Sequence, residues 1–352
     1  MSLPSRAKAC TRSREHPQRV VLLAPVPRDL RPDTDLDAIV ADLAEALAAR
    51  ASVSVEHVMT PSDIVQVVER RRPDVVFNAC ETLEGRSDGE PLVPALLQRM
   101  GVPFTGNPAR CLRLCLHKAR ASVVLRHAGV RVPATFEHGA NVRFPVIVKP
   151  ASEDGSVGIH AGSVVHDDAG LARAIAELGR PIDENGSVDV APLRRPIVQE
   201  YIEGREIAVS LLGWPRARVL SPGEILYDER TFADRARILT YASKWDPASP
   251  DFGATQAVAA ELDPALLETL SEAALRAMAA LGMRDYGRID FRVDRDGRAF
   301  VIDANPNCDL ARDAGFMRAA QRSGFTYEAT IWAIFEGALA RRRGASIEHA
   351  TA

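Results

Sequence analysis

The stretch from Tyr286 to Leu310 constrains the fold of this chain more than any other segment. In its first half, apolar residues alternate with charged ones from position 288 to position 293, which is the period of a half-buried strand. The segment Asp294-Arg-Asp-Gly297 supplies a turn, because glycine adopts positive φ without a steric cost. A second apolar run, Ala299-Phe-Val-Ile302, then leads to Asp303 and Asn305. The sequence therefore predicts a β-hairpin.

Three oxygen-bearing side chains gather on this predicted hairpin: Asp290 on the first strand, and Asp303 and Asn305 at the end of the second. Carboxylate and amide oxygens are hard ligands that suit Mg²⁺. Arg288 lies on the same strand face as Asp290, and an arginine beside a metal site can stabilise negative charge that develops on a reacting oxygen. On this pattern alone, an exposed acidic hairpin with solvated charges explains the residues equally well, because acidic turns are common.

The composition is that of a globular protein with two or three domains. The chain has 352 residues, of which 46% are hydrophobic and 26% are charged, and its formal net charge is −3. This balance argues against a nucleic-acid-binding protein, and no apolar run is long enough to cross a bilayer, so we expect neither nucleic acid nor a membrane as a partner. Five scattered cysteines favour a reducing cytoplasm. Residues 1–17 lack the apolar core of a secretory signal, and we expect a disordered tail there.

Residues 18–117 show the alternation of a parallel α/β domain. The continuous apolar run at 20–24 predicts a buried strand, residues 53–55 and 74–77 predict two more, and helical spacing predicts helices from Thr34 to Leu47 and from Ser62 to Arg72. A third helix is predicted from Pro91 to Met100. Strands that alternate with helices in this way favour an open parallel sheet with helices on both faces.

A second region, residues 118–212, contains a candidate phosphate-binding loop. A helix is predicted from Lys118 to His127, and a strand from Pro145 to Lys149 runs into the Gly/Ser segment 150–158, which contains Ser156. Backbone N–H groups of such a loop can face an anion, and the lysine adds a positive charge. An ordinary turn is the alternative, because most Gly/Ser loops are only turns.

The third region, residues 213–345, contains a long irregular stretch and two clear helices. Just before it, residues 198–209 predict two strands around a Glu203-Gly204 turn. Residues 214–245 show little periodicity, which indicates a functional loop or lid. A final helix is predicted from Tyr327 to Arg342. The clearest helix runs from Asp263 to Gly282, and the residues predicted to form its apolar face are Leu266, Leu267, Leu270, Ala274, Leu275 and Met278.

Taken together, the order and spacing of these motifs resemble the ATP-grasp superfamily, and within it the D-alanine–D-alanine ligase group. The resemblance extends from about Phe77 to Tyr327. The motifs that carry it are Thr105-Gly106 followed by Lys118, Val148-Lys149-Pro150 with the loop to Gly158, Gln199 to Glu206, Tyr241-Ala-Ser-Lys-Trp245, and Tyr286-Gly-Arg-Ile-Asp-Phe291 with Asp303-Ala-Asn305. Counted together, these motifs favour a metal site in the hairpin over an acidic surface.

The resemblance implies an α/β chain in three parts: an N-terminal parallel-sheet domain and two ATP-grasp subdomains of α+β type, with the nucleotide between antiparallel sheets. It also implies two cofactors, ATP and Mg²⁺, the latter as two ions for which Mn²⁺ can substitute. The implied cofactor-binding residues are Lys118, Lys149 and Lys244 for the phosphates, Gln199, Glu200 and Ile202 for the adenine, and Glu206 for the ribose hydroxyls. The implied metal ligands are Asp290, Asp303 and Asn305, and the implied catalytic residues are Arg288, Lys244 and Ser156.

The chemistry of that family joins a carboxylate to an amine. The carboxylate attacks the γ-phosphorus of ATP to give an acyl phosphate and ADP, and the amine then attacks the activated carbonyl while Arg288 faces the oxyanion. Both initial reactants are anions, so cations are needed to bring them together. The implied substrates are small carboxylates and amines, either amino acids or a peptide. Dimers are frequent in the family, so a homodimer is also implied.

Several departures from the family concern the amino-acid sites. The Gly-rich segment with a Glu that normally follows the first strand is replaced by residues 24–32, which contain neither residue type. Trp245 stands in place of an anchoring tyrosine. The usual Thr-x-Pro-Gly-Met-Thr after the metal-binding Asn is replaced by Pro306-Asn-Cys-Asp-Leu310. Asn307 and Asp309 of this segment, together with Trp245, are therefore candidates for substrate selection.

The sequence thus predicts an ATP-dependent carboxylate–amine ligase that forms an amide or dipeptide, with ADP and phosphate as products, from a substrate pair other than two D-alanines. The first alternative is a D-alanine–D-alanine ligase of cell-wall synthesis. The second, from a different class, is a nucleotide-binding regulatory protein without turnover. Arg288 argues against the regulatory protein, because binding alone would not need this arginine.

Overall fold

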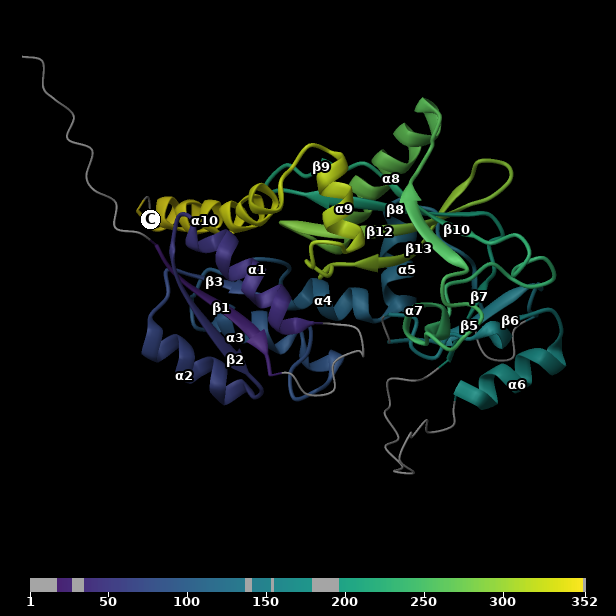
Figure 1. The fold of residues 1–352 in the computed structure, drawn as a ribbon, viewed down its shortest axis with the longest axis horizontal. Coiled ribbons are helices and arrows are strands. Elements are labelled where there is room, and N and C mark those ends of the chain that lie inside the picture. The colour runs from purple at the N-terminus through teal and green to yellow at the C-terminus, as the bar shows by residue number, and fades with distance from the viewer. Residues whose placement is uncertain (1–17, 27–34, 137–140, 153–154, 179–195, 351–352) are drawn as a thin grey trace, which may run out of the picture.

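Three sheets organise the chain, one parallel and two antiparallel (Figure 1). The computed structural model describes residues 18–26, 35–136, 141–152, 155–178 and 196–350, with side chains described up to residue 342. The expected tail over residues 1–17 lies outside the described residues. None of the described helices combines the length and the apolar character that a bilayer crossing requires.

The first sheet is parallel, as predicted, and has the strand order β2-β1-β3. Its strands are β1 (Arg19–Pro25), β2 (Ser52–Val58) and β3 (Val75–Asn78). Alternate side chains of β1 enter two separate cores. Val20 and Leu22 pack with helices α1 (Leu36–Ala48) and α10 (Tyr327–Ala350), whereas Val21 and Leu23 pack with α2 (Pro61–Arg71) and α3 (Leu92–Arg99). Helices therefore cover both faces, which confirms the prediction for this sheet.

The helix starts in this part are set by capping side chains. Helix α1 begins at Leu36, because the carboxylate of Asp35 accepts a hydrogen bond from the backbone N–H of Ala38 at 3.0 Å. The predicted start, Thr34, lies outside the described residues. Helix α2 begins after Thr60, which forms a capping box with Asp63, and its first residue is a proline that already has a helical φ.

The second sheet is antiparallel, with the order β4-β7-β5-β6. Its strands are β4 (Thr135–Phe136), β5 (Val146–Pro150), β6 (Val164–Val165) and β7 (Pro196–Glu200). Helix α6 (Asp168–Leu178) covers one face, where Ala174 and Leu178 form a small core with Val146 and Val148. Lys149 is the penultimate residue of β5, so the predicted lysine lies at the end of an inner strand of this sheet.

The third sheet is antiparallel and has the order β11-β10-β8-β12-β13, with β9 paired to β8. Its strands are β8 (Arg205–Leu212), β9 (Arg218–Val219), β10 (Gly223–Tyr227), β11 (Thr255–Ala259), β12 (Tyr286–Val293) and β13 (Ala299–Asn305). The predicted hairpin is therefore confirmed as β12 and β13. Strand β13 extends to Asn305, so Asp303 and Asn305 lie within the strand.

Helix α8 (Pro264–Leu281) has the predicted limits, since Asp263 caps its start and Gly282 ends it in the left-handed conformation. Leu270, Ala274 and Met278 are buried as predicted. Leu267 and Leu275 are 38% and 39% exposed, so the prediction that they belong to the apolar face is wrong. They lie to one side of the buried stripe, because each residue turns the helix by about 100°.

Two connections were only partly predicted. Strands β7 and β8 do flank Glu203-Gly204, but they belong to different sheets, so this segment joins two sheets and does not form a hairpin. Gly204 has φ +152° and a Cβ there would lie 2.0 Å from the carbonyl oxygen of Val293, so no other residue fits. The stretch 214–245 is more regular than predicted, because it contains β9, β10 and the short helix α7 (Tyr241–Trp245).

The cores connect segments that are distant in the sequence. Helices α4 (Ala109–Leu116) and α5 (Lys118–His127) pack with α8 against strands β8, β12 and β13. Helix α10 lies along α1 beside the parallel sheet, while α9 (Gly315–Arg322) enters the same core from the end of the hairpin (Figure 1). The predicted division into residues 18–117, 118–212 and 213–345 stays a prediction.

Candidate functional site

A cavity of about 610 Å³ is lined by residues from both antiparallel sheets. Every residue that the sequence singled out for catalysis, cofactor binding, metal binding or substrate selection lines this cavity. These residues are Lys118, Lys149, Ser156, Gln199, Glu200, Ile202, Glu206, Lys244, Trp245, Arg288, Asp290, Asp303, Asn305, Asn307 and Asp309. The structure thus brings the whole predicted set together, while the role of each residue stays a prediction.

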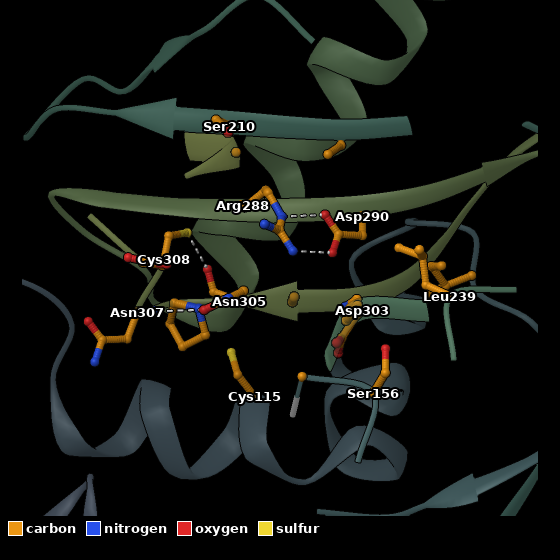
Figure 2. A pocket seen from close by; sticks show the side chains of 18 of the residues that line it. Cys115, Ser156, Ser210, Leu239, Arg288, Asp290, Asp303, Asn305, Asn307 and Cys308 are labelled. Carbon is orange, nitrogen blue, oxygen red and sulfur yellow. Dashed lines mark hydrogen bonds and ion pairs between the residues drawn. The ribbon is translucent and has the colours of Figure 1, made fainter. Parts of the chain in front are cut away.

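Strand β12 directs Arg288 and Asp290 toward the centre of this cavity (Figure 2). Nε and Nη2 of Arg288 donate to the two carboxylate oxygens of Asp290, at 2.7 and 2.8 Å, so the pair is bidentate. Attraction to Asp290 raises the pKa of Arg288 above its usual range in spite of burial. The guanidinium is therefore a fixed positive charge at the centre of the cavity.

Strand β13 places Asp303 directly opposite Asp290 in the register of the hairpin. One carboxylate oxygen of Asp303 accepts a hydrogen bond from Nζ of Lys118 at 2.9 Å. Burial acts to raise the pKa of Asp303. The positive charges of Lys118 and then Lys149 act in the opposite direction and outweigh burial, so the pKa lies below its usual value. Asp303 is therefore held in its charged form. Two residues on, the side-chain oxygen of Asn305 accepts from the backbone N–H of Asn307 at 3.0 Å.

Two buried lysines face these carboxylates. Lys118 lies at the first turn of α5 and Lys149 near the end of β5, and each is 8% exposed. Nζ of Lys149 donates to the carbonyl oxygen of Ile302 at 3.2 Å. Burial, followed by repulsion from Lys118, lowers the pKa of Lys149 to about 8. The lysines thus concentrate positive charge at the place where a polyanion would be neutralised.

The donor set of the hairpin fits Mg²⁺ in its chemistry. Asp290, Asp303 and Asn305 offer two carboxylates and one amide oxygen, and hard oxygen ligands suit Mg²⁺. Within the described residues, no group of three or more His, Cys, Asp and Glu side chains could hold a metal ion.

The nucleotide residues implied by the resemblance occupy the side of the cavity near β7 and β8. The amide nitrogen of Gln199 donates to the hydroxyl of Thr135 at 3.1 Å. The carboxylate of Glu200 accepts from the backbone N–H of Ala134 at 3.2 Å, and Ile202 is buried. One oxygen of Glu206 accepts from the hydroxyl of Tyr227 at 2.7 Å.

A second donor to Glu206 was not foreseen from the sequence. Nη2 of Arg292 donates to the same carboxylate oxygen at 2.7 Å. The strand alternation that identified Arg288 and Asp290 continues to Arg292, so its place on the cavity side could have been predicted. The contact of Tyr227 could not, because this residue lies in the stretch that showed little periodicity.

Helix α7 contacts the Gly/Ser loop. The indole N–H of Trp245 donates to the carbonyl oxygen of Gly155 at 3.1 Å. The backbone N–H of Tyr241 donates to the carbonyl oxygen of Ile159 at 2.9 Å. Ser156 has φ +65°, the left-handed conformation that non-glycine residues rarely adopt. Trp245 lacks the hydroxyl of the family's tyrosine, but its N–H ties the lysine-bearing helix to the loop.

The opposite end of the cavity centres on Asn307 (Figure 2). Its side-chain oxygen accepts from the hydroxyl of Tyr286 at 2.5 Å. Its side-chain nitrogen donates to Glu90 at 2.6 Å and to the carbonyl oxygen of Cys80 at 3.2 Å. Glu90 is a cavity residue that sequence reasoning missed, since its partner lies 217 positions away.

Two other side chains at this end have narrower roles. The carboxylate of Asp309 accepts from the backbone N–H of Ala311 at 2.8 Å, which shapes the turn after β13. Cys308 is buried, and burial raises the pKa of its thiol to about 12.

Residues 122–336 match the family model described as "D-ala D-ala ligase C-terminus". A protein of Sinorhizobium fredii named only as uncharacterized protein y4sG is 30% identical over 283 residues, which is 79% of this chain and 78% of that protein. The D-alanine–D-alanine ligase of a Chelativorans species is 30% identical over 258 residues, covering 71% of this chain and 74% of that enzyme.

Solved structures show the same fold. The crystal structure of D-alanine–D-alanine ligase from Bacillus anthracis complexed with ATP superimposes with a TM-score of 0.68 at 19% identity, covering 94% of this chain and 100% of that one. The VanG D-Ala:D-Ser ligase from Enterococcus faecalis superimposes with a TM-score of 0.67 at 16% identity, covering 92% of this chain and 100% of that one.

Proposed function

Because this chain belongs to the D-alanine–D-alanine ligase family and has the ATP-grasp fold, we propose that it is a ligase that uses ATP to join a carboxylate to an amine. The observation that carries this proposal is the centre of the cavity. There the cations Arg288, Lys118 and Lys149 surround the oxygen ligands Asp290 and Asp303. A site of this kind can hold two anionic reactants against their mutual repulsion.

ATP would lie between the two antiparallel sheets. Lys118 and Lys149 would contact its phosphates, and Lys244 would approach from α7. The edge of the base would meet Gln199, with Glu200 and Ile202 acting through their backbones. The carboxylate of Glu206 would accept hydrogen bonds from the ribose hydroxyls.

Asp290, Asp303 and Asn305 would hold Mg²⁺, as two ions. When bound, Mg²⁺ supplies charge neutralisation for the phosphates during phosphoryl transfer. Asp290 and Asp303 lie on paired strands, so one hairpin brings both carboxylates to the same place.

The residues of this chain then account for the two chemical steps. An oxygen of the substrate carboxylate bonds to the γ-phosphorus, and the bond from that phosphorus to the bridging oxygen breaks, giving an acyl phosphate and ADP. The amine next attacks the acyl carbon, and the resulting oxyanion faces the guanidinium of Arg288. Collapse of this intermediate breaks the carbon–oxygen bond to the phosphate, so that phosphate and a proton leave and the amide remains. Pairing with Asp290 keeps Arg288 charged and fixed throughout.

The substrate pair is proposed to differ from two D-alanines. The network of Asn307, Glu90 and Tyr286 supports this, because it occupies the end of the cavity at which the family's usual second-substrate segment is replaced. The D-alanine–D-alanine ligase of Chelativorans, at 30% identity, favours D-alanyl-D-alanine synthesis as the second candidate.

The test is ATP-dependent phosphate release across L- and D-amino acids and small carboxylates, with mass spectrometry of each mixture. We expect a condensation product that has lost one water relative to its two inputs, together with ADP. Reaction of D-alanine pairs alone would establish the second candidate. ATP binding without phosphate release from any mixture would favour the regulatory alternative.

A further inference from the structure

Arg292 is a buried arginine beside the proposed ribose position. It follows Arg288 and Asp290 on the cavity side of β12 and is 4% exposed. A guanidinium at this depth requires a charged partner and acceptors for its remaining N–H groups. Glu206 supplies the charge and accepts from Nη2 at 2.7 Å, the backbone carbonyl of Arg237 also accepts from Nη2, and that of Gly204 accepts from Nη1. The side chain is therefore held in one orientation.

The hydrogen bonds to Glu206 are concentrated on one of its two oxygens. The hydroxyl of Tyr227 and Nη2 of Arg292 both donate to Oε2, each at 2.7 Å. Among the described residues, no hydrogen bond reaches Oε1. Glu206 lines the cavity, so its second oxygen is available to a ligand there.

Glu206, Arg292 and Tyr227 form a compact unit. The guanidinium carbon of Arg292 lies 5.8 Å from the ring centre of Tyr227 and 5.9 Å from that of Tyr201, which restricts the arginine from two directions. A glutamate on its own loses rotamer freedom when it binds a ligand, whereas one that is already held does not. The cost of orienting Glu206 is thus met when the protein folds.

We propose that Arg292, assisted by Tyr227, is a positioning residue that fixes the carboxylate of Glu206 to receive the ribose hydroxyls of the nucleotide. This inference rests on the proposed function, since it requires a nucleotide in the cavity. Its consequence is that discrimination between ATP and its deoxy analogues depends on an arginine that acts through Glu206.

The experiment measures the Kd of ATP, 2′-deoxy-ATP and 3′-deoxy-ATP by calorimetry, with Mg²⁺ and the full chain. A hydrogen bond to a charged acceptor makes the wild-type protein bind at least one deoxy analogue about tenfold more weakly than ATP. In Arg292→Met we expect the Kd of ATP to rise about tenfold and that of the analogue to change by less than about threefold. The ratio of the Kd of the analogue to the Kd of ATP therefore approaches one. In turnover, KM for ATP rises by more than kcat falls.

Two further variants keep the test sharp. Tyr227→Phe removes one donor to Glu206 without uncovering a charge, so it should fold, and we expect the ratio to fall about threefold. Arg205→Met is the matched control, because it removes an arginine that is paired with Glu224 at 2.7 Å in the same sheet. The ratio should keep its wild-type value in this control.

The outcomes separate this inference from the proposed function. ATP binding with a ratio that stays at the wild-type value in both Arg292→Met and Tyr227→Phe overturns the positioning role and leaves the ligase proposal intact. The same holds if the wild-type protein binds ATP and both analogues equally well. Failure of the wild-type protein to bind ATP overturns both.

Discussion

At the scale of single residues, the pair of Arg288 and Asp290 decides what the cavity can do. The two side chains share two hydrogen bonds, and the guanidinium stays charged because of its partner. An arginine fixed in this way stabilises charge that appears in the transition state without having to reorganise. Its contribution should therefore appear in the rate of ligation and hardly at all in nucleotide affinity.

We expect Arg288→Ala to lower kcat for ligation about 10²–10³-fold while the Kd of ATP stays within about threefold. Steady-state phosphate release and calorimetry measure the two quantities. Arg298→Ala is the control, since Arg298 also pairs with an aspartate of this hairpin, Asp294, but at its exposed turn. Near-normal turnover in Arg288→Ala would contradict the assignment.

A second residue prediction concerns the pKa of Lys149, which burial and then Lys118 lower to about 8 from an ordinary 10.5. Between these two values the unfolded chain binds more protons, so this lysine makes the free energy of unfolding rise with pH. The proposed contact of Lys149 with the ATP phosphates is tighter when the lysine is charged, so the affinity for ATP should fall as pH rises through about 8, with proton uptake on binding above that pH.

Calorimetry at pH 9 in buffers of different ionisation enthalpy measures this proton uptake. Lys149→Arg is the matched variant, because a guanidinium stays protonated throughout the range. We expect the uptake to disappear in this variant. An identical pH profile for the two proteins would exclude Lys149 as its source.

At the scale of elements, helix α10 secures the start of strand β12. Asp285, which precedes the strand, is fully buried and accepts hydrogen bonds from both terminal nitrogens of Arg341 on α10. The backbone N–H of Gly106 donates to the same carboxylate at 2.8 Å. The helix therefore fixes the strand that carries Arg288 and Asp290.

Arg341→Met should lower the free energy of unfolding by about 3–5 kcal/mol, because it leaves the Asp285 carboxylate buried without its cation. Arg342→Met is the control: this neighbour pairs with Asp74 at 3.5 Å on the surface and should cost about 1 kcal/mol or less. Urea unfolding of the two variants measures both values, and similar midpoints would refute the anchoring role.

The elements also show what the sequence could and could not predict. The hairpin, the parallel sheet and α8 were predictable because alternation, apolar runs and capping residues are local signals. Strands β10 and β11 were missed, because their own sequences do not alternate clearly. They form strands because β10 pairs with β8 and β11 pairs with β10. Glu203-Gly204 predicted a change of direction but not which sheet each strand would join.

At the scale of the whole molecule, the cavity depends on contacts between distant parts of the chain. The motifs predicted which residues would line it, because each motif is local. The hydrogen bonds of Glu90 and Tyr286 to Asn307 could not be predicted in this way, although all three residues line the cavity. Such partners become visible only when the parallel-sheet part and the hairpin are assembled.

Asn307→Ala removes the side-chain hydrogen bonds to Glu90, Tyr286 and the Cys80 carbonyl. We expect KM for the amine substrate to rise about tenfold, with the Kd of ATP within about twofold, because buried polar partners are left unpaired at that end only. Asp309→Ala is the comparison and should change KM less, since the Asp309 carboxylate accepts from a backbone N–H within a turn. Equal effects of the two changes on KM would argue against a special role for Asn307.

Strand β12 carries Arg288, Asp290 and Arg292 on one face and buries Ile289, Phe291 and Val293 on the other. A single inserted or deleted residue before Arg288 would exchange the two faces, placing three charges in the core and three apolar side chains in the cavity. The proposed ligation and nucleotide recognition would be lost in one event. Divergence among relatives of this protein should therefore proceed by substitution within this strand, and changes of length should be confined to the loops around it.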